Sequence, residues 1–210
     1  MSEAQRSRGR PRDLLKREAI LDAAAELFYE RGRAATTMDA VAERASVSKM
    51  TVYSHFPDKP ALLEASFERN INEIRLPELA DRADLAASIE ALVGFGERLI
   101  GFLTRPEIVK GGRLMAASSA DHPALAAAFF AAGPATMLAR VANFLRSLDA
   151  RGLLAVDDPD LVGEQLLGAW LGMNQLKQNL GIAGPPSPEE ISGNVRRATQ
   201  IFVTALSQRY

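Results

Sequence analysis

The sequence predicts an all-α fold, in which a small N-terminal helix-turn-helix domain is followed by a larger helical domain. Three observations predict it. Apolar residues recur at helical spacing along most of the 210 residues. Prolines stand where several helices would begin. No segment shows the sustained period-two alternation between turns that a β-strand requires.

The first 17 residues are strongly basic. Six arginines and lysines stand there against Glu3 and Asp13, a net charge of +4 in a chain whose net charge is −1. Arginines that alternate with glycine and proline oppose a helix, so residues 1–11 are expected to form a flexible arm. Such an arm fits the narrow minor groove of A·T-rich DNA, although a basic tail can also serve only as a solubilising end. The arginines expected in the groove are Arg8, Arg10 and Arg12.

Residues 36–60 predict two short helices separated by a polar break at residues 45–47. The first helix can begin at Thr36 or Thr37, because threonine caps free helix N–H groups. Asp39 follows Thr36 by three residues, as the acidic residue of a capping box does. The apolar residues that would let the helices cross closely are Val41, Ala42, Val47, Val52 and Phe56.

The second helix of this pair carries polar and aromatic side chains where a core helix would be apolar, which is typical of a helix that enters a DNA groove. Ammonium, phenol and imidazole groups donate to phosphate without reading a base, whereas short side chains can reach base edges. Two alternatives stay open: Tyr53 can pack half-buried beside Phe56, and Met50 can lie against the protein. The predicted phosphate contacts are Lys49, Tyr53, His55 and Lys59, and the predicted base contacts are Ser48, Met50, Thr51 and Ser54.

This stretch resembles the helix-turn-helix of TetR-family transcriptional regulators. The matching residues are Thr36-Thr37, Ala45, Val47-Ser48-Lys49, Thr51-Val52-Tyr53, His55-Phe56 and Lys59. The resemblance covers residues 12–75 and implies that Thr37, Tyr53, His55 and Lys59 contact phosphates, while Lys49, Met50 and Thr51 reach bases. It places Thr36 in the same DNA-binding segment.

Two positions depart from the family pattern, which usually has glycine at both. Ser46 would cost about 1 kcal/mol if the turn requires a left-handed residue. Met50 puts a flexible apolar side chain where it could touch a thymine methyl group.

The remainder of the chain predicts successive helices that begin at a cap or a proline. The expected helices span residues 58–74, 84–103, 106–119, 123–150, 159–180 and 188–207, and Gly32, Gly152 and Gly181 are expected to end helices. Residues 12–57 are therefore expected to form the helix-turn-helix domain, 58–75 a connecting helix, and 76–210 a ligand-binding and dimerisation domain.

A homodimer is expected because one recognition helix reads only a few base pairs, and twofold pairing doubles the site as an inverted repeat. The resemblance implies that the last two helices pair with their copies in a four-helix bundle, although the same apolar pattern also fits an intramolecular core. The predicted interface residues are Leu161, Gly168, Leu171, Gly172, Val195 and Phe202.

A pocket for a small hydrophobic ligand is expected among the middle helices, where deformable apolar side chains accompany a few polar ones. Plain core packing is the alternative for each of them. The predicted lining is Phe95, Phe102, Met115, Phe129, Met137, Asn143, Trp170, Met173 and Asn174. A ligand that prefers a different spacing of the two recognition helices would release DNA by linkage. A ligand-blind regulator is the alternative.

Other classes of protein are disfavoured. The chain has no cysteine and only two histidines, so neither disulfides nor a zinc cluster is expected, and no cofactor is predicted. Residues 118–122 contain the residue types of a catalytic triad, but they crowd one helix end, so an enzyme is not expected. A helical protein-binding scaffold is a further alternative. No signal peptide or membrane span is expected, because the apolar stretch 85–103 carries three charges, and the protein is therefore predicted to be cytoplasmic.

Overall fold

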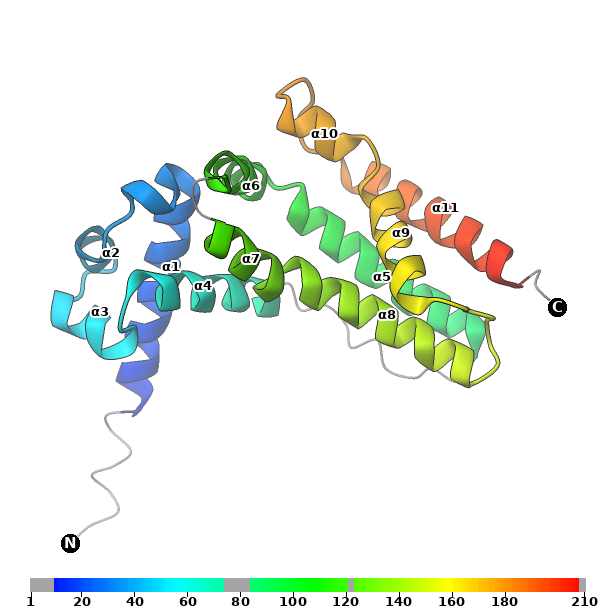
Figure 1. Ribbon diagram of the computed structural model, residues 1–210, viewed down its shortest axis with the longest axis horizontal. Helices are drawn as coiled ribbons and strands as arrows, with labels where there is room; N and C mark the ends of the chain where they lie inside the picture. Colours follow the sequence, from blue (N-terminus) through cyan, green and yellow to red (C-terminus); the bar gives the residue numbers. More distant parts are fainter. Residues whose placement is uncertain (1–9, 74–83, 121–122, 208–210) are drawn as a thin grey trace, which may run out of the picture. The chain divides into compact units, whose positions relative to one another are not determined.

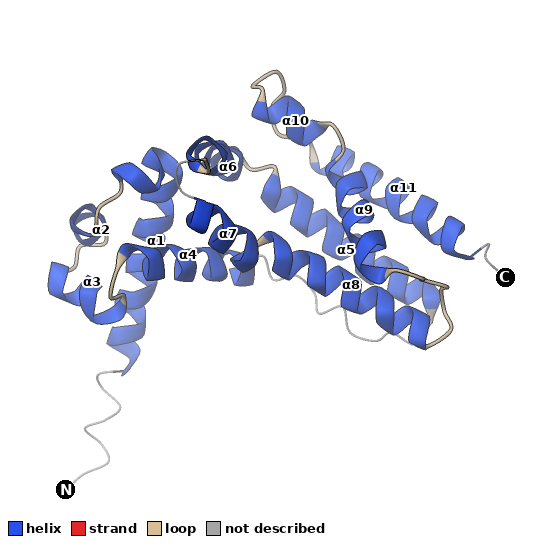
Figure 2. Ribbon diagram, viewed as in Figure 1, coloured by secondary structure: helices blue, strands red, loops and turns tan. Residues whose placement is uncertain are grey.

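The computed structural model describes residues 10–73, 84–120 and 123–207, and every regular element in these ranges is a helix (Figure 2). The all-α prediction is confirmed. The chain divides into two compact units (Figure 1). The first contains the N-terminal helices up to residue 71 together with residues 110–129, and the second contains residues 72–109 and 130–210.

The N-terminal part of the first unit consists of four helices. They are α1 (Arg10–Ala35), α2 (Met38–Arg44), α3 (Lys49–His55) and α4 (Lys59–Glu73). α1 already includes Arg10 and Pro11, which the sequence placed in the flexible arm, because a proline in the first helical turn removes an N–H that has no intrahelical partner. Gly32, with φ of 73°, interrupts the helical geometry of α1 near its end, as expected.

The core of the first unit is apolar and continuous across these helices. Its most deeply buried side chains are Ile20, Leu21 and Leu27 of α1, Val41 of α2, Val52 of α3 and Leu62 of α4. α4 is also held to α1 by ionic contacts, since Arg69 pairs with Glu18 and Asp22. Each of α2, α3 and α4 thus contributes to one core against α1, which fixes the orientation of α3.

The second unit is a bundle around a buried tryptophan. Its helices are α5 (Leu85–Leu103), α8 (Pro134–Ala150), α9 (Pro159–Leu171), α10 (Asn174–Asn179) and α11 (Pro188–Ser207). The Trp170 indole N–H donates to Thr199 Oγ1 at 3.0 Å. α6 (Pro106–Ser118) and α7 (Pro123–Ala132) lie between α5 and α8 in the chain. The predicted starts at Asp84, Pro106, Pro123, Pro159 and Pro188 are confirmed, with Asp84 capping α5 through the Ala87 N–H.

Two helices that the sequence predicted as continuous are broken. The segment 123–150 divides into α7 and α8 at Gly133, because Pro134 lacks an N–H and restricts the residue before it. The segment 159–180 divides into α9 and α10 at Gly172, whose φ of 53° is left-handed. Gly152 and Gly181 also have positive φ, as expected of residues that end helices.

One stretch of the described chain, Ala126–Ala150, is long and apolar enough by length and composition to cross a membrane. It comprises the end of α7 and the whole of α8, and the break at Gly133 interrupts it. α8 buries Val141, Phe144 and Leu145 in the core of the second unit. These contacts account for part of its apolar character, since 28% of its most apolar 18 residues are buried.

Candidate nucleic-acid interface

The turn between α2 and α3 is set by local hydrogen bonds. Thr37, the second of the two predicted starting residues, caps α2 by accepting from the Ala40 N–H at 3.1 Å. Ser48 caps α3 by accepting from the Thr51 N–H at 3.1 Å. Between the helices, Ser46 has φ of 54°, so the turn does require a left-handed residue at this position. The predicted helix-turn-helix is confirmed in the fold.

α3 uses one side to dock and leaves the other free. Val52 is fully buried in the first unit and Phe56 is nearly so. Met50 is 81% exposed and does not lie against the protein, whereas Tyr53 is 44% exposed, which leaves the half-buried alternative open for it. Thr51 is half-buried, and its hydroxyl lies 2.8 Å from that of Ser48. The exposed side chains of this helix and its cap are Ser48, Lys49, Met50, Tyr53 and Ser54.

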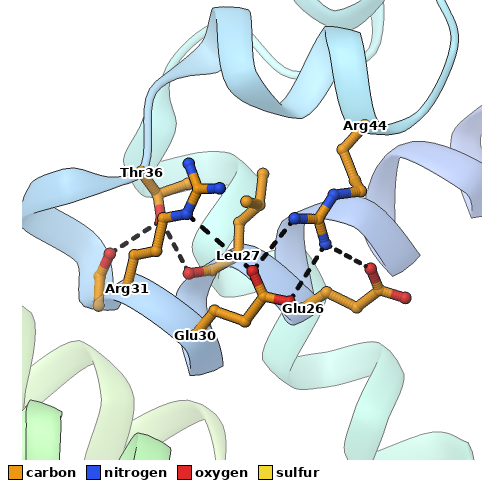
Figure 3. Close-up of polar contacts among 7 residues, drawn as sticks. Glu26, Leu27, Glu30, Arg31, Thr36 and Arg44 are labelled. Atoms are coloured by element: carbon orange, nitrogen blue, oxygen red, sulfur yellow. Dashed lines mark hydrogen bonds and ion pairs between the residues drawn. The ribbon is translucent and has the colours of Figure 1, made fainter.

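An ionic cluster fastens α2 to α1 (Figure 3). Arg44 Nη1 lies 2.8 Å from Glu26 Oε2, and Arg44 Nη2 lies 3.1 Å from Glu30 Oε2. The hydrogen bond to Arg44 lowers the pKa of Glu30, and the two carboxylates raise the pKa of Arg44. The Glu30 carboxylate and the Arg44 guanidinium therefore stay charged at neutral pH, and the cluster links α2 to α1.

Thr36 differs from its predicted role. The sequence placed it among the DNA contacts, but its side chain is fully buried, and its hydroxyl donates to Leu27 O at 3.1 Å and to Gly32 O at 2.8 Å (Figure 3). Thr36 therefore satisfies backbone carbonyl groups near the end of α1 and does not face DNA. Thr37 caps α2 and is exposed beside it.

The cations predicted to contact phosphates already have partners inside the first unit. Lys49 Nζ lies 2.7 Å from Asp39 Oδ1, which raises the pKa of Lys49. Lys59 Nζ donates to the carbonyl oxygen of Thr36 at 2.8 Å. Asp39 does not serve the expected capping box, because the residue that caps α2 is Thr37 and Asp39 is therefore not the third residue after the cap. Sequence spacing alone gave no sign of its pairing with Lys49.

His55 was expected to point outward, and it does not. Its side chain is only 11% exposed, and its Nε2 lies 3.2 Å from Asp13 Oδ1 of α1. The ring packs against Phe56, with the ring centroids 6.2 Å apart. The Arg17 guanidinium lies 5.4 Å from the Phe56 ring centroid.

The predicted minor-groove arginines fall at or beyond the edge of the described chain. Arg8 lies outside the described residues, and Arg10 and Arg12 are placed only as the backbone of the first turn of α1. Their role in DNA binding stays a prediction.

The residues predicted for the ligand pocket are divided between the two units. Phe95, Met137 and Trp170 are buried in the core of the second unit. Phe102 is half-buried, whereas Asn143, Met173 and Asn174 are exposed. Met115 and Phe129 belong to the first unit. A narrow apolar cleft of the second unit lies elsewhere, between α5, α8, α9 and α11, with Ile89, Leu148, Val162 and Phe202 in its lining.

The residues predicted for the dimer interface also separate into two groups. Leu161 and Gly168 are exposed on α9, and Leu171 is half-buried. Gly172 ends α9. Val195 is fully buried in the core of its own chain, and Phe202 lines the apolar cleft. Ile201, which the prediction did not select, is 68% exposed on α11. The helical period of the apolar arc on α11 could have separated it from its buried neighbours.

Two family models match the chain. Residues 20–66 match the model described as bacterial regulatory proteins, tetR family, and residues 90–207 match the model described as AefR-like transcriptional repressor, C-terminal domain. Together they cover both the helix-turn-helix and most of the larger helical part.

Individual proteins are similar over shorter or longer stretches. The chain is 38% identical over 118 residues to the HTH-type transcriptional regulator YdeS of Bacillus subtilis (strain 168), covering 56% of this chain and 57% of that protein. It is 36% identical over 114 residues to the HTH-type transcriptional activator FasR of Mycolicibacterium smegmatis, covering 47% and 52%. The chain thus spans about half the length of these two curated relatives. The solved structure of the flavonoid-responsive regulator FrrA is 31% identical, with a TM-score of 0.74 over 93% of this chain and 98% of that one.

Proposed function

Because this chain belongs to the TetR family of DNA-binding transcriptional regulators, we propose that it is a homodimeric repressor of an inverted-repeat operator. A small hydrophobic effector releases it from the operator in this proposal. Members of the family are regulators and not enzymes, so the chain is a regulator of transcription. Binding chromosomal DNA puts its site of action in the cytoplasm, as is general in the family.

The exposed face of α3 carries the proposal. Val52 anchors the helix in the core, and the opposite side presents Lys49, Met50 and Tyr53 to solvent. An ammonium group and a phenol suit phosphates, while a methionine suits a thymine methyl group in the major groove. The ionic cluster that links Arg44 of α2 to Glu26 and Glu30 of α1 supports a fixed orientation of this face.

Symmetry supports the inverted repeat. A seven-residue helix such as α3 can read only a few base pairs, whereas two copies about 34–36 Å apart read two half-sites in successive major grooves. The exposed residues Leu161 and Gly168 of α9 and Ile201 of α11 offer an apolar surface for such a pairing.

Similarity to known regulators supports the proposed effector and the proposal that the protein represses transcription. FrrA is described as flavonoid-responsive, and the larger helical part of this chain matches a model of transcriptional repressors. We therefore propose a flat, largely apolar aromatic effector and repression as the mode of action. FasR is an activator, so the sign requires its own test.

Selection of bound sites from random duplex DNA tests the proposal. A twofold-symmetric site with half-site centres about one helical turn apart is expected. On that site, Lys49→Ala should weaken binding to every sequence and reduce the salt slope by about 0.9, whereas Met50→Ala should relax the base preference at one position in each half-site. Flavonoids added to the complex should lower its affinity, and transcription from a template carrying the site should then rise.

Three outcomes would contradict parts of the proposal. An asymmetric selected site would contradict the dimer, and unchanged affinity with every flavonoid would indicate a ligand-blind regulator or another effector class. Lower transcription on release of the protein would indicate an activator.

A further inference from the structure

Arg140 of α8 is a partly buried cation in the second unit that lacks a carboxylate partner. Its guanidinium carbon lies 5.8 Å from the centroid of the Phe95 ring of α5, and that ring is fully buried. Among the described residues, no carboxylate forms an ion pair with Arg140, and no oxygen accepts a hydrogen bond from its guanidinium. The aromatic contact offsets part of the cost of removing the charge from water, but it leaves the five N–H donors of the guanidinium without acceptors from these residues.

Two other arginines that lie between helices of the second unit do have carboxylate partners. Arg196 of α11 pairs with Glu90 of α5 at 2.8 Å, and Arg146 of α8 pairs with Asp160 of α9. Both of these arginines are exposed, whereas Arg140 is only partly exposed. The cost of an unpaired charge rises with burial, so Arg140 needs a counter-ion more than they do. An anion from outside the chain would supply it.

The side chains on the same side of the helices as Arg140 are apolar. Met137, one turn before Arg140 on α8, is buried. The centroid of the Phe95 ring lies 6.4 Å from that of Trp170, which is also buried. Phe102, two turns after Phe95 on α5, is half-buried. A single cation beside aromatic and thioether groups suits a ligand that has an apolar body and one acidic group.

Resting on the effector proposed above, we propose that Arg140 binds an ionised acidic group of this effector, which is therefore an aromatic acid such as an aromatic carboxylic acid. The planar guanidinium can donate two parallel hydrogen bonds to a carboxylate. The side chain is partly exposed, so a ligand can reach the guanidinium from solvent. In this proposal the aromatic body of the ligand lies against the apolar side chains beside Arg140.

Isothermal titration calorimetry of the full chain with 2-naphthoate and 2-naphthamide tests this inference, because the two compounds share their rings and differ in the charge of the head group. The wild type should bind 2-naphthoate about tenfold more tightly than 2-naphthamide. Arg140→Met keeps a flexible apolar side chain against the Phe95 ring, so it should weaken binding of 2-naphthoate about tenfold and that of 2-naphthamide less than about twofold. Arg146→Met, on the same helix, should change neither affinity, because Arg146 already pairs with Asp160.

Several results would overturn the inference. They are absence of 2-naphthoate binding by the wild type, equal affinity of the wild type for the two compounds, and unchanged affinity of Arg140→Met for 2-naphthoate. Equal weakening of both compounds in Arg140→Met would also overturn it, because Arg140 would then serve only in packing. The titration contains no DNA, so its failure concerns Arg140 alone, whereas failure to select any DNA site would overturn the proposed function instead.

Discussion

Ser46 shows how one residue sets the geometry of the DNA-reading helix. It holds φ of 54° between α2 and α3, and its backbone N–H donates to Glu43 O at 3.1 Å. The next N–H, that of Val47, donates to Ala42 O at 3.0 Å. These bonds stop α2 and turn the chain toward α3. A Cβ at such a φ is strained, so the serine is retained at a cost to stability.

Replacement of this serine by glycine should stabilise the protein. Ser46→Gly removes the Cβ strain, partly offset by the greater backbone freedom of glycine in the unfolded chain, for a net gain of about 0.5–1 kcal/mol in the free energy of unfolding. Urea denaturation measures this change in the free energy of unfolding. Ser54→Gly, in the regular part of α3, is the matched control and should lose about 0.5–1 kcal/mol. A loss of stability in Ser46→Gly would show that the turn does not strain the serine.

The sequence predicted which residues of α3 are exposed better than it predicted their partners. Exposure of Met50 and Tyr53 follows from the helical period, which is local. The proximity of Asp13 to His55 and of Asp39 to Lys49 depends on how separate helices pack, and no spacing rule reports it. The burial of Thr36 beneath the end of α1 was missed for the same reason.

Five helices of the described chain, α5, α6, α7, α9 and α11, begin where the sequence predicted, and the ends of helices were predicted less well. Caps and prolines are local signals, so Asp84 and Pro188 mark the starts of α5 and α11 correctly. The breaks at Gly133 and Gly172 were missed because the apolar pattern continues through both positions. Whether a glycine stays helical depends on tertiary contacts that the pattern does not contain.

Gly96 illustrates a glycine whose role comes from packing between helices. A Cβ built on it would lie 2.7 Å from Val195 Cγ1 and 3.1 Å from Trp170 Cδ2. The close approach of α5 to α11 and α9 therefore requires the absence of a side chain at this position. Neither Val195 nor Trp170 can move freely, because both are buried and the Trp170 indole is hydrogen-bonded to Thr199.

Gly96→Ala should therefore destabilise the second unit. Overpacking of this kind costs about 1–3 kcal/mol, which outweighs the gain in helix propensity of about 1 kcal/mol. Gly101→Ala is the control on the same helix, since a Cβ there has no atom within 4 Å, and it should leave stability unchanged or raise it by up to about 1 kcal/mol. Thermal unfolding followed by circular dichroism checks both. Equal melting temperatures for the two variants would mean that α5 and α11 can separate without cost.

At the scale of the whole molecule, the division of the chain departs from the order of its sequence. Residues 110–129 pack with the first unit, although they lie far along the chain. Leu114 Cβ lies 3.8 Å from the position that a Cβ at Gly32 would take, so α6 meets the end of α1. The sequence predicted a boundary near residue 76, because a sequence shows only the order of the helices along the chain. Which helices pack into the same unit depends on the contacts of the folded chain.

The second unit leaves apolar residues of α9 and α11 exposed, and dimer formation should depend on them. Ile201 is 68% exposed on α11, and Leu161 and Gly168 are exposed on α9. A Cβ at Gly168 would have no atom within 4 Å, so a helix of a second copy can approach closely there. Burial of apolar area of this kind is the main favourable term in most protein association.

Ile201→Asp should convert the dimer to a monomer of 22.7 kDa, because a carboxylate buried without a partner at the interface costs more than the lost apolar contact. Sedimentation velocity at micromolar concentration measures the mass directly and does not require operator DNA. Leu15→Asp is the matched control, since Leu15 is 70% exposed in α1 of the first unit and should leave the mass of the dimer unchanged. If Ile201→Asp remains dimeric while the wild type is dimeric, the subunits pair through a different surface, and the spacing of the recognition helices must be set by other residues.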